Sequence, residues 1–179
     1  IRFFRWLIMI FIIALSLSMD AFSLSLAYGT QNIENKTKYS IAIVVGLFHF
    51  FMPLIGNLLG NIILSVIKIN PNIIVSIILT FIGISMCFKK EENVNPIKNI
   101  IEIFLFALAV SLDSFSVGIG IKAITNNILL SSSIFSLTAG IITYLGIILG
   151  NEISKKVGFL APIIGGISLI IIGLMYVFK

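Results

Sequence analysis

The sequence predicts an all-α polytopic membrane protein with six transmembrane helices, arranged as two inverted three-helix repeats. Hydrophobic residues make up 59% of the 179 residues and charged residues only 11%, and the mean hydropathy is +1.17. This composition is far from the balance of a soluble domain. Six apolar stretches are each long enough to cross a hydrocarbon core, which takes about 17 to 25 helical residues. In addition, a segment containing an aspartate recurs 93 positions along the chain.

The six predicted helices follow one another with short connections. They cover residues 6–28, 39–67, 72–88, 99–121, 130–150 and 159–178. The longest polar connector, residues 89–98, contains charges, two asparagines and a proline, which is typical of a linker. We therefore divide the chain into a first repeat (1–90), a connecting loop (91–98) and a second repeat (99–179). The net charge of +5 lies mainly in loops and termini, which favours contact with lipid headgroups and argues against nucleic acid as a partner.

The first apolar stretch also has features of a cleavable secretory signal. Arg2 and Arg5 precede the apolar run, and the small residues at 25–27 resemble a cleavage site. Cleavage would remove Asp20 but keep its counterpart in the second repeat. We therefore interpret this stretch as a retained first helix.

The internal repeat extends over both halves of the chain. Residues 14–23 read ALSLSMDAFS and residues 107–116 read ALAVSLDSFS. Glycine-containing segments at 56–63 and 146–153 also match, at an offset of 90 positions. Each repeat then holds three helices, and an odd number of crossings makes the two halves insert in opposite directions. Secondary transporters built on this plan bind their substrate near the membrane midplane, between the repeats.

Asp20 and Asp113 are the first candidate site residues, because each lies near the centre of an apolar helix. An ionised carboxylate there costs about 2.5 to 3.5 kcal/mol on insertion scales, so a matched pair is expected to have a function. The hydroxyls of Ser23 and Ser116 share a face with these aspartates and are further candidate metal ligands. All same-face neighbours are small: Ser16, Ser23 and Ala27 around Asp20, and Ala109, Ser116 and Gly120 around Asp113. The alternative is that each aspartate is protonated and only links helices.

His49 is the third candidate for the site. It lies four residues before Pro53, which has no N–H, so the His49 carbonyl loses its helical hydrogen-bond donor. The residue thus offers a carbonyl oxygen and an imidazole nitrogen, and both suit a first-row divalent cation. The ring is equally suited to relay protons. The alternative is a histidine that is hydrogen-bonded inside the bundle beside a proline kink.

Other features have structural interpretations. Residues 56–60 and 146–150 each contain Gly-x-x-x-Gly, which favours close helix packing. Glu102 is near the start of the fourth helix, where the helix dipole favours a carboxylate. Cys87 is the single cysteine, which excludes a thiolate metal cluster. The sequence contains no Gly-x-x-x-x-Gly-Lys-Ser/Thr segment, so ATP is not predicted as the direct energy source.

At these motifs the chain resembles the MntP-type manganese efflux pumps, bacterial six-helix membrane proteins built from two three-helix repeats. The resemblance runs in order through segments 18–22, 53–56, 111–114, 117–120 and 165–173. It implies export of Mn(II) across the cytoplasmic membrane, with Asp20 and Asp113 at the positions of the family's aspartates in the first and fourth helices. Mn(II) is then the transported substrate, no cofactor is implied, and the protein is not an enzyme.

The chain departs from this family at three positions. His49 stands where family members carry Glu or Gln, Pro162 replaces an acidic residue near the start of the sixth helix, and Lys89 replaces a glutamate near the end of the third. These changes leave the aspartate pair intact but bear on metal selectivity. Residues 111–116 also resemble the sporulation-associated YtaF-type proteins, so a membrane protein without manganese transport is the alternative function.

The mechanism that these residues favour is alternating access. Mn(II) would bind between the repeats to Asp20 and Asp113, with Ser23, Ser116 and His49 completing the shell, and protons would reset the carboxylates in a cation/proton antiport.

One rival is an intramembrane protease with a carboxylate dyad, but the Gly-x-Gly-Asp segment of such enzymes is absent. The other is a helix scaffold that transports nothing. The side of the membrane that holds the termini has five Lys and Arg residues, and the other side has seven. Because positive residues favour the cytoplasmic side, this small difference favours termini on the outside. The sequence gives no prediction of a homo-oligomer.

Overall fold

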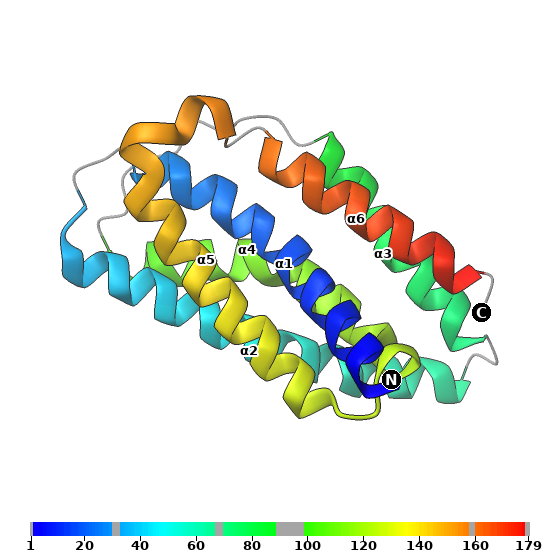
Figure 1. Cartoon of the computed structure of the whole chain (residues 1–179). Helices are drawn as coiled ribbons and strands as arrows, with labels where there is room; N and C mark the ends of the chain where they lie inside the picture. Colours follow the sequence, from blue (N-terminus) through cyan, green and yellow to red (C-terminus); the bar gives the residue numbers. More distant parts are fainter. Residues whose placement is uncertain (1, 30–32, 67–69, 89–98, 158–159, 178–179) are drawn as a thin grey trace.

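The structure is a computed structural model, and it describes residues 2–29, 33–66, 70–88, 99–157 and 160–177. Within these residues the chain forms six α-helices, shown in Figure 1. They are α1 (Arg2–Gly29), α2 (Asn35–Val66), α3 (Pro71–Cys87), α4 (Ile100–Ile124), α5 (Ile128–Val157) and α6 (Leu160–Val177). The all-α prediction is confirmed, and each helix coincides with one predicted stretch to within a few residues at most ends. Lys89 and the predicted connecting loop 91–98 lie outside the described residues.

The predicted helices were too short wherever a helix continues into polar sequence. Prediction placed the start of the second helix at residue 39, but α2 begins at Asn35 and the amide of Lys38 already donates to the carbonyl of Glu34, at 3.1 Å. Likewise α5 continues to Val157, seven residues beyond the predicted end at residue 150. These polar turns form backbone hydrogen bonds like any other turn, but they carry no apolar periodicity that a hydropathy reading can detect.

Glycines bring α2 against α4 and α1 against α5 in the same way. An added Cβ on Gly56 would meet the carbonyl of Phe115 and lie 3.1 Å from Gly118 Cα. An added Cβ on Gly146 would lie 3.0 Å from the carbonyl of Phe22 and 2.8 Å from Ser25 Cβ. The two sets of contacts correspond through the repeat offsets of 93 and 90 positions. One turn further along, an added Cβ on Gly60 would meet the carbonyl of Ile119, and one on Gly150 would meet the carbonyl of Leu26. Higher numbers on one helix thus meet higher numbers on the other, so α2 runs parallel to α4 and α1 runs parallel to α5.

The third helices of the two halves pack on each other with the same correspondence. An added Cβ on Gly83 would lie 2.7 Å from the side chain of Ile170, and one on Gly173 would lie 2.6 Å from the hydroxyl of Thr80. Gly83 and Gly173 are 90 positions apart, as are Thr80 and Ile170. The higher-numbered residue of α3, Gly83, thus meets the lower-numbered residue of α6, Ile170, and Thr80 meets Gly173. The two helices therefore run in opposite directions (Figure 1).

The α2–α5 contact fixes the relative direction of the two halves. An added Cβ on Gly46 would lie 3.2 Å from the carbonyl of Ser136, and one on Gly140 would lie 3.2 Å from the carbonyl of Ala42. Lower numbers on α2 thus meet higher numbers on α5, and these helices are antiparallel. Since α1 is parallel to α5 and α4 is parallel to α2, helices α1 and α4 run in opposite directions (Figure 1).

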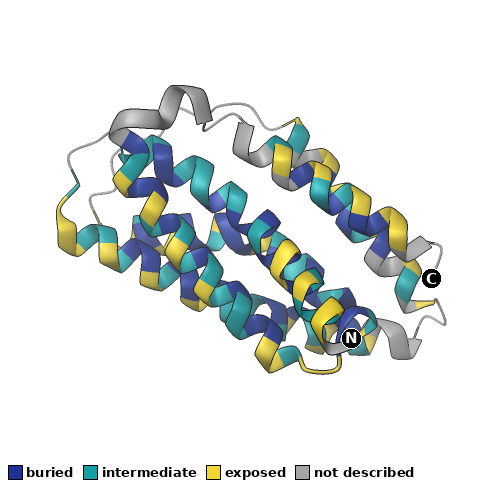
Figure 2. Ribbon diagram, in the orientation of Figure 1, coloured by how far each residue is buried: buried dark blue, intermediate teal, exposed yellow. Residues whose placement is uncertain are grey.

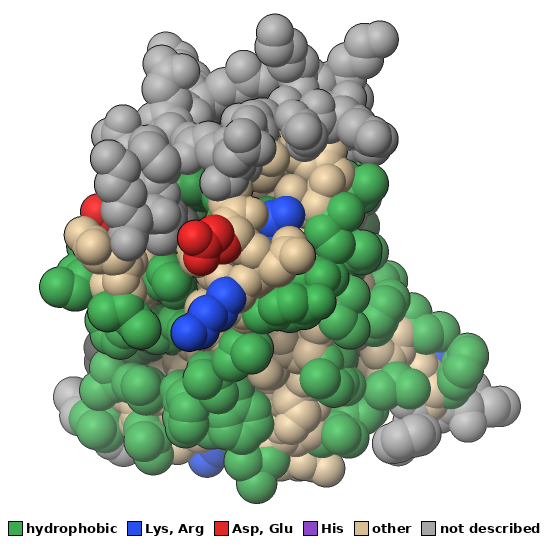
Figure 3. Space-filling view, turned by 90° about the vertical axis from the view of Figure 1, so that its left-hand side faces the viewer, with side chains coloured by type: hydrophobic (Ala, Val, Ile, Leu, Met, Phe, Trp, Pro, Cys, Tyr) green, Lys and Arg blue, Asp and Glu red, His purple; other side chains and the backbone are tan. Residues whose placement is uncertain are grey.

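Burial separates a packed interior from an apolar outer surface. Buried residues lie between the helices and exposed ones face outward (Figure 2), and Figure 3 shows hydrophobic side chains over most of the described surface on one face. Phe81 and Leu137, for example, are 71% and 66% exposed. By length and composition, four of the described helical segments can cross a membrane: Phe4–Gly29, Asn35–Ile62, Ile100–Ile124 and Ile128–Gly150. The described apolar segment of α6, Gly166–Met175, is shorter.

Candidate metal-transport site

Asp20 and Asp113 occupy corresponding positions in the interior of the bundle. Both side chains are partly buried, and the Oδ1 atom of Asp20 and the Oδ2 atom of Asp113 are shielded from solvent. The other oxygen of Asp113 accepts a hydrogen bond from the backbone N–H of Ser114 at 2.6 Å. The helices α1 and α4 that carry the aspartates contact each other directly. The structure therefore places one carboxylate in each half, on two touching helices of opposite direction.

The predicted serine ligands are half-buried beside the aspartates along their own helices. Ser23 lies on α1 and Ser116 on α4, each three residues after its aspartate. The Ser116 hydroxyl donates to the carbonyl of Leu112 at 3.1 Å, so its hydrogen is directed along its own helix. The oxygen lone pairs of that hydroxyl are still available to a cation.

His49 is fully buried in α2, and its tautomer follows from its one hydrogen bond. Its Nδ1 atom lies 3.0 Å from the carbonyl oxygen of Val45. A carbonyl can only accept, so Nδ1 carries the hydrogen and donates it. In the neutral ring, Nε2 then bears a lone pair, and this atom has no hydrogen-bond partner among the described residues. Metal-binding histidines are held in this way, with one ring N–H on a backbone carbonyl and the other nitrogen toward the metal.

The prediction from the sequence did not include four buried hydroxyls that have no hydrogen-bond partner within the described part of the chain. They belong to Ser25, Ser114, Ser132 and Thr143. A buried hydroxyl left unpaired costs about 1 to 3 kcal/mol, so these positions need a partner beyond the described residues, such as water or an ion. Serine and threonine occur on any face of an apolar helix, so only the packing shows which of them are buried. The one sequence signal is that their counterparts under the repeat are apolar: Gly118, Ala21, Ala42 and Pro53.

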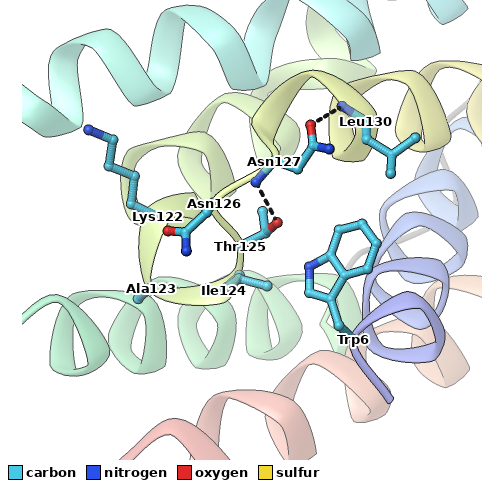
Figure 4. Close-up of a pocket in the computed structure, with 8 residues that line it drawn as sticks. All are labelled: Trp6, Lys122, Ala123, Ile124, Thr125, Asn126, Asn127 and Leu130. Carbon is cyan, nitrogen blue, oxygen red and sulfur yellow. Dashed lines mark hydrogen bonds between the residues drawn. The ribbon is translucent and has the colours of Figure 1, made fainter. Parts of the chain in front are cut away.

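The predicted ligands do not form one compact cluster in this conformation. Among the described residues, no three His, Cys, Asp or Glu side chains are close enough to hold one metal ion together. A cavity of about 440 Å³ lies elsewhere, at the α4–α5 turn beside the start of α1 (Figure 4). Trp6 faces this turn, in which the N–H of Asn127 donates to the Thr125 hydroxyl at 3.0 Å. None of the predicted site residues lines this cavity.

Comparison with known proteins identifies the family. A family model described as "Putative manganese efflux pump" matches residues 32–177. The chain belongs to this family, MntP. A protein of Bacillus pumilus named "Putative manganese efflux pump MntP" is 33% identical over 172 residues, which cover 93% of this chain and 92% of that protein. One of Bacillus mycoides is 32% identical, with 96% of both chains covered. No solved structure matches this chain.

Membership of the MntP family confirms the resemblance drawn from the sequence motifs. The family model includes the helix that carries Asp113 and begins after the helix that carries Asp20, whereas the alignments with the two relatives cover more than nine-tenths of each chain. The description of the family states the function of efflux pump for the family as a whole and names no residues. The roles of individual residues rest on the geometry given above.

Proposed function

We propose that this protein is a secondary transporter that exports Mn(II) across the bacterial cytoplasmic membrane. Support comes from the family description and from relatives named as manganese efflux pumps over nearly their whole length. The apolar exterior and the helices long enough to cross a membrane agree with this location. Mn(II) is the cargo, and the mechanism needs no bound cofactor.

The transporter consists of two inverted three-helix repeats, residues 1–90 and 99–179, whose six helices all cross the membrane. The proposal is supported by the exchange of glycine contacts at the repeat offsets and by the opposite directions of α1 and α4. α3 and α6 are shorter than the other four helices, with 17 and 18 residues. At about 1.5 Å per residue this gives about 26 to 27 Å, which crosses a hydrocarbon core with little tilt.

The observation that carries the proposal is the pair of half-buried carboxylates on touching helices of opposite direction. Asp20 and Asp113 together offer two negative charges to a divalent cation in a low-dielectric setting, where such attraction is strong. Ser23, Ser116 and His49 add hydroxyl and imidazole donors. Carboxylate and hydroxyl oxygens are the ligands that Mn(II) prefers.

Transport proceeds by alternating access with protons as the counter-ion. Mn(II) partly stripped of water binds to the ionised aspartates, the repeats rock against each other, and the site opens to the outside. The emptied carboxylates then take up protons, which neutralises them for the return step. Because Asp20, Asp113 and His49 do not form one three-residue group among the described residues, we propose that closure of the repeats around the ion assembles the shell.

The test uses proteoliposomes containing the full chain, loaded with Mn(II) and placed in a pH gradient. We expect Asp20→Asn and Asp113→Asn each to lower Mn(II) flux at least tenfold, because amides carry no charge to hold the cation. Glu102→Gln is the matched control, since Glu102 is a carboxylate at the exposed start of α4. Its flux should stay within about twofold of the native chain. Unchanged flux in both aspartate variants would overturn the site, and no flux in the native chain would favour a scaffold or a YtaF-like role.

A further inference from the structure

We propose that His49, Ser114 and Ser132 form a specificity site that gives a nitrogen ligand to the transported metal, so that the protein also binds and carries Zn(II) and Co(II). This inference rests on the proposed function and deepens it. We call these three residues the His49 cluster. They come from α2, α4 and α5, and each has a buried polar atom with no hydrogen-bond partner among the described residues: His49 Nε2, Ser114 Oγ and Ser132 Oγ.

The packing of α2 on α4 brings His49 level with Ser114. An added Cβ on Gly118 would lie 2.6 Å from Pro53 Cα, so these two residues meet at the interface. His49 precedes Pro53 by four residues and Ser114 precedes Gly118 by four, which is about one helical turn in each case. The helices run parallel, and residues four apart share a face. His49 and Ser114 therefore lie at one level and face the same interface, beside Asp113.

The packing of α2 on α5 brings Ser132 to the same level. An added Cβ on Gly46 would lie 3.2 Å from the carbonyl oxygen of Ser136, and these two helices are antiparallel. Ser132 precedes Ser136 by one turn on α5, and His49 follows Gly46 by about one turn on α2. In antiparallel helices these displacements go the same way along the membrane normal. The three unpaired polar atoms thus gather around one level of α2.

The repeat shows that packing alone does not require polar residues here. Under the repeat offsets, His49, Ser114 and Ser132 correspond to Ala139, Ala21 and Ala42. All three alanines are buried, two of them fully. The matching level of the other half is therefore filled by three methyl groups, while this level holds an imidazole and two hydroxyls. A polar group in the bundle costs free energy unless it finds a partner, so the polar set points to a ligand.

The imidazole decides which ligand this is. Nδ1 is committed to the Val45 carbonyl, which leaves the Nε2 lone pair directed away from its own backbone. A neutral imidazole nitrogen binds Zn(II) and Co(II) more strongly than Mn(II), following the general order of affinities for nitrogen donors. With Asp113 next to Ser114, the site offers one nitrogen, one carboxylate and hydroxyl oxygens. Such a mixed set accepts Mn(II) but favours the later metals.

The single histidine makes a direct test possible. We would label the full chain with [15N]histidine, so that the spectrum contains one imidazole. In the metal-free protein, the ring nitrogens should report a hydrogen on Nδ1 and a bare Nε2. Addition of Zn(II), which is diamagnetic, should shift Nε2 far more than Nδ1. This readout needs no substitution in the chain, so it does not depend on whether a variant folds.

Binding and flux measurements complete the test. We expect His49→Gln to lower the ratio of Zn(II) affinity to Mn(II) affinity at least about tenfold, because Zn(II) loses a favoured nitrogen donor whereas Mn(II) accepts the amide oxygen in its place. Ser114→Ala and Ser132→Ala, which copy the alanines of the other half, should fold normally and weaken Zn(II) binding less.

The outcomes separate the two proposals. If the native chain carries no Mn(II), the proposed function fails. If Mn(II) is carried but Zn(II) leaves Nε2 unshifted, the specificity site is overturned and the proposed function stands. An unchanged ratio of Zn(II) to Mn(II) affinity in His49→Gln would overturn it equally.

Discussion

Replacing Gly118 by alanine tests the close approach of α2 and α4 that holds the site together. The new Cβ would lie 2.6 Å from Pro53 Cα and 2.9 Å from its carbonyl carbon. Ordinary contacts between carbon atoms are about 3.5 to 4.0 Å, so the helices would have to separate by about 1 Å. No side-chain rotation can relieve the overlap, because the opposing atoms belong to the backbone of a proline.

The magnitude follows from two opposing effects. Overpacking of this kind costs about 1 to 3 kcal/mol, and backbone atoms on both sides place Gly118 at the upper end. Alanine regains up to about 1 kcal/mol because it is a better helix former than glycine. We therefore expect Gly118→Ala to lower the free energy of unfolding by about 2 kcal/mol.

The assay is reversible unfolding of the full chain in detergent, with Gly140→Ala as the matched control. At Gly140 the nearest atom to an added Cβ is the Ala42 carbonyl oxygen at 3.2 Å, so only a small shift is needed. The gain in helix propensity should cancel that cost to within about 0.5 kcal/mol. Equal effects of the two substitutions would refute the interpretation that backbone contact at Gly118 sets the helix spacing.

Two further stability predictions use the same unfolding assay. Phe135 is 1% exposed in the core, so Phe135→Ala should lower the free energy of unfolding by about 3 to 5 kcal/mol. The control Phe81→Ala, at a residue that is 71% exposed, should lower it by less than about 1 kcal/mol. Similar losses in the two variants would contradict the burial of Phe135. The Glu102 carboxylate accepts the N–H of Asn99 at the start of α4, so Glu102→Ala should cost about 0.5 to 1 kcal/mol and Glu102→Gln much less. Equal costs for Ala and Gln would exclude this capping bond.

The number and order of the helices could be predicted from the sequence because apolar length is a strong signal. Each of the six helices overlaps one predicted stretch over nearly the whole length of that stretch. Their ends could not be predicted, since the polar turns at 35–38 and 151–157 form helix without an apolar pattern. The glycine pairs at 56–60 and 146–150 were correctly interpreted as packing contacts. Their partners, such as Phe115 and Phe22, became known only from the structure.

The candidate site was predictable in its charged members and not in its neutral ones. Asp20, Asp113 and His49 stand out because ionisable side chains are rare in apolar helices. Ser114 and Ser132 do not, because a serine can satisfy its hydroxyl on the carbonyl four residues back, as Ser18 does on Ala14 at 2.7 Å. Whether a serine does so, or keeps its hydroxyl for a ligand, depends on helix packing and not on local sequence.

The structure separates two requirements that a repeated membrane protein must meet. Helix spacing depends on backbone contacts, and these recur at corresponding glycines in both halves, as at Gly56 and Gly146. The candidate donor set depends on side chains next to those contacts, and there the halves differ. The aspartates recur, whereas alanines occupy the three positions that correspond to the His49 cluster in the other half. Because the glycine contacts that set the helix spacing lie outside the cluster, the specificity proposal predicts that a change at position 49 alters the ligand chemistry without altering how the helices pack. The same proposal predicts that metal selectivity varies among chains of this fold while the two aspartates and the glycine contacts stay the same.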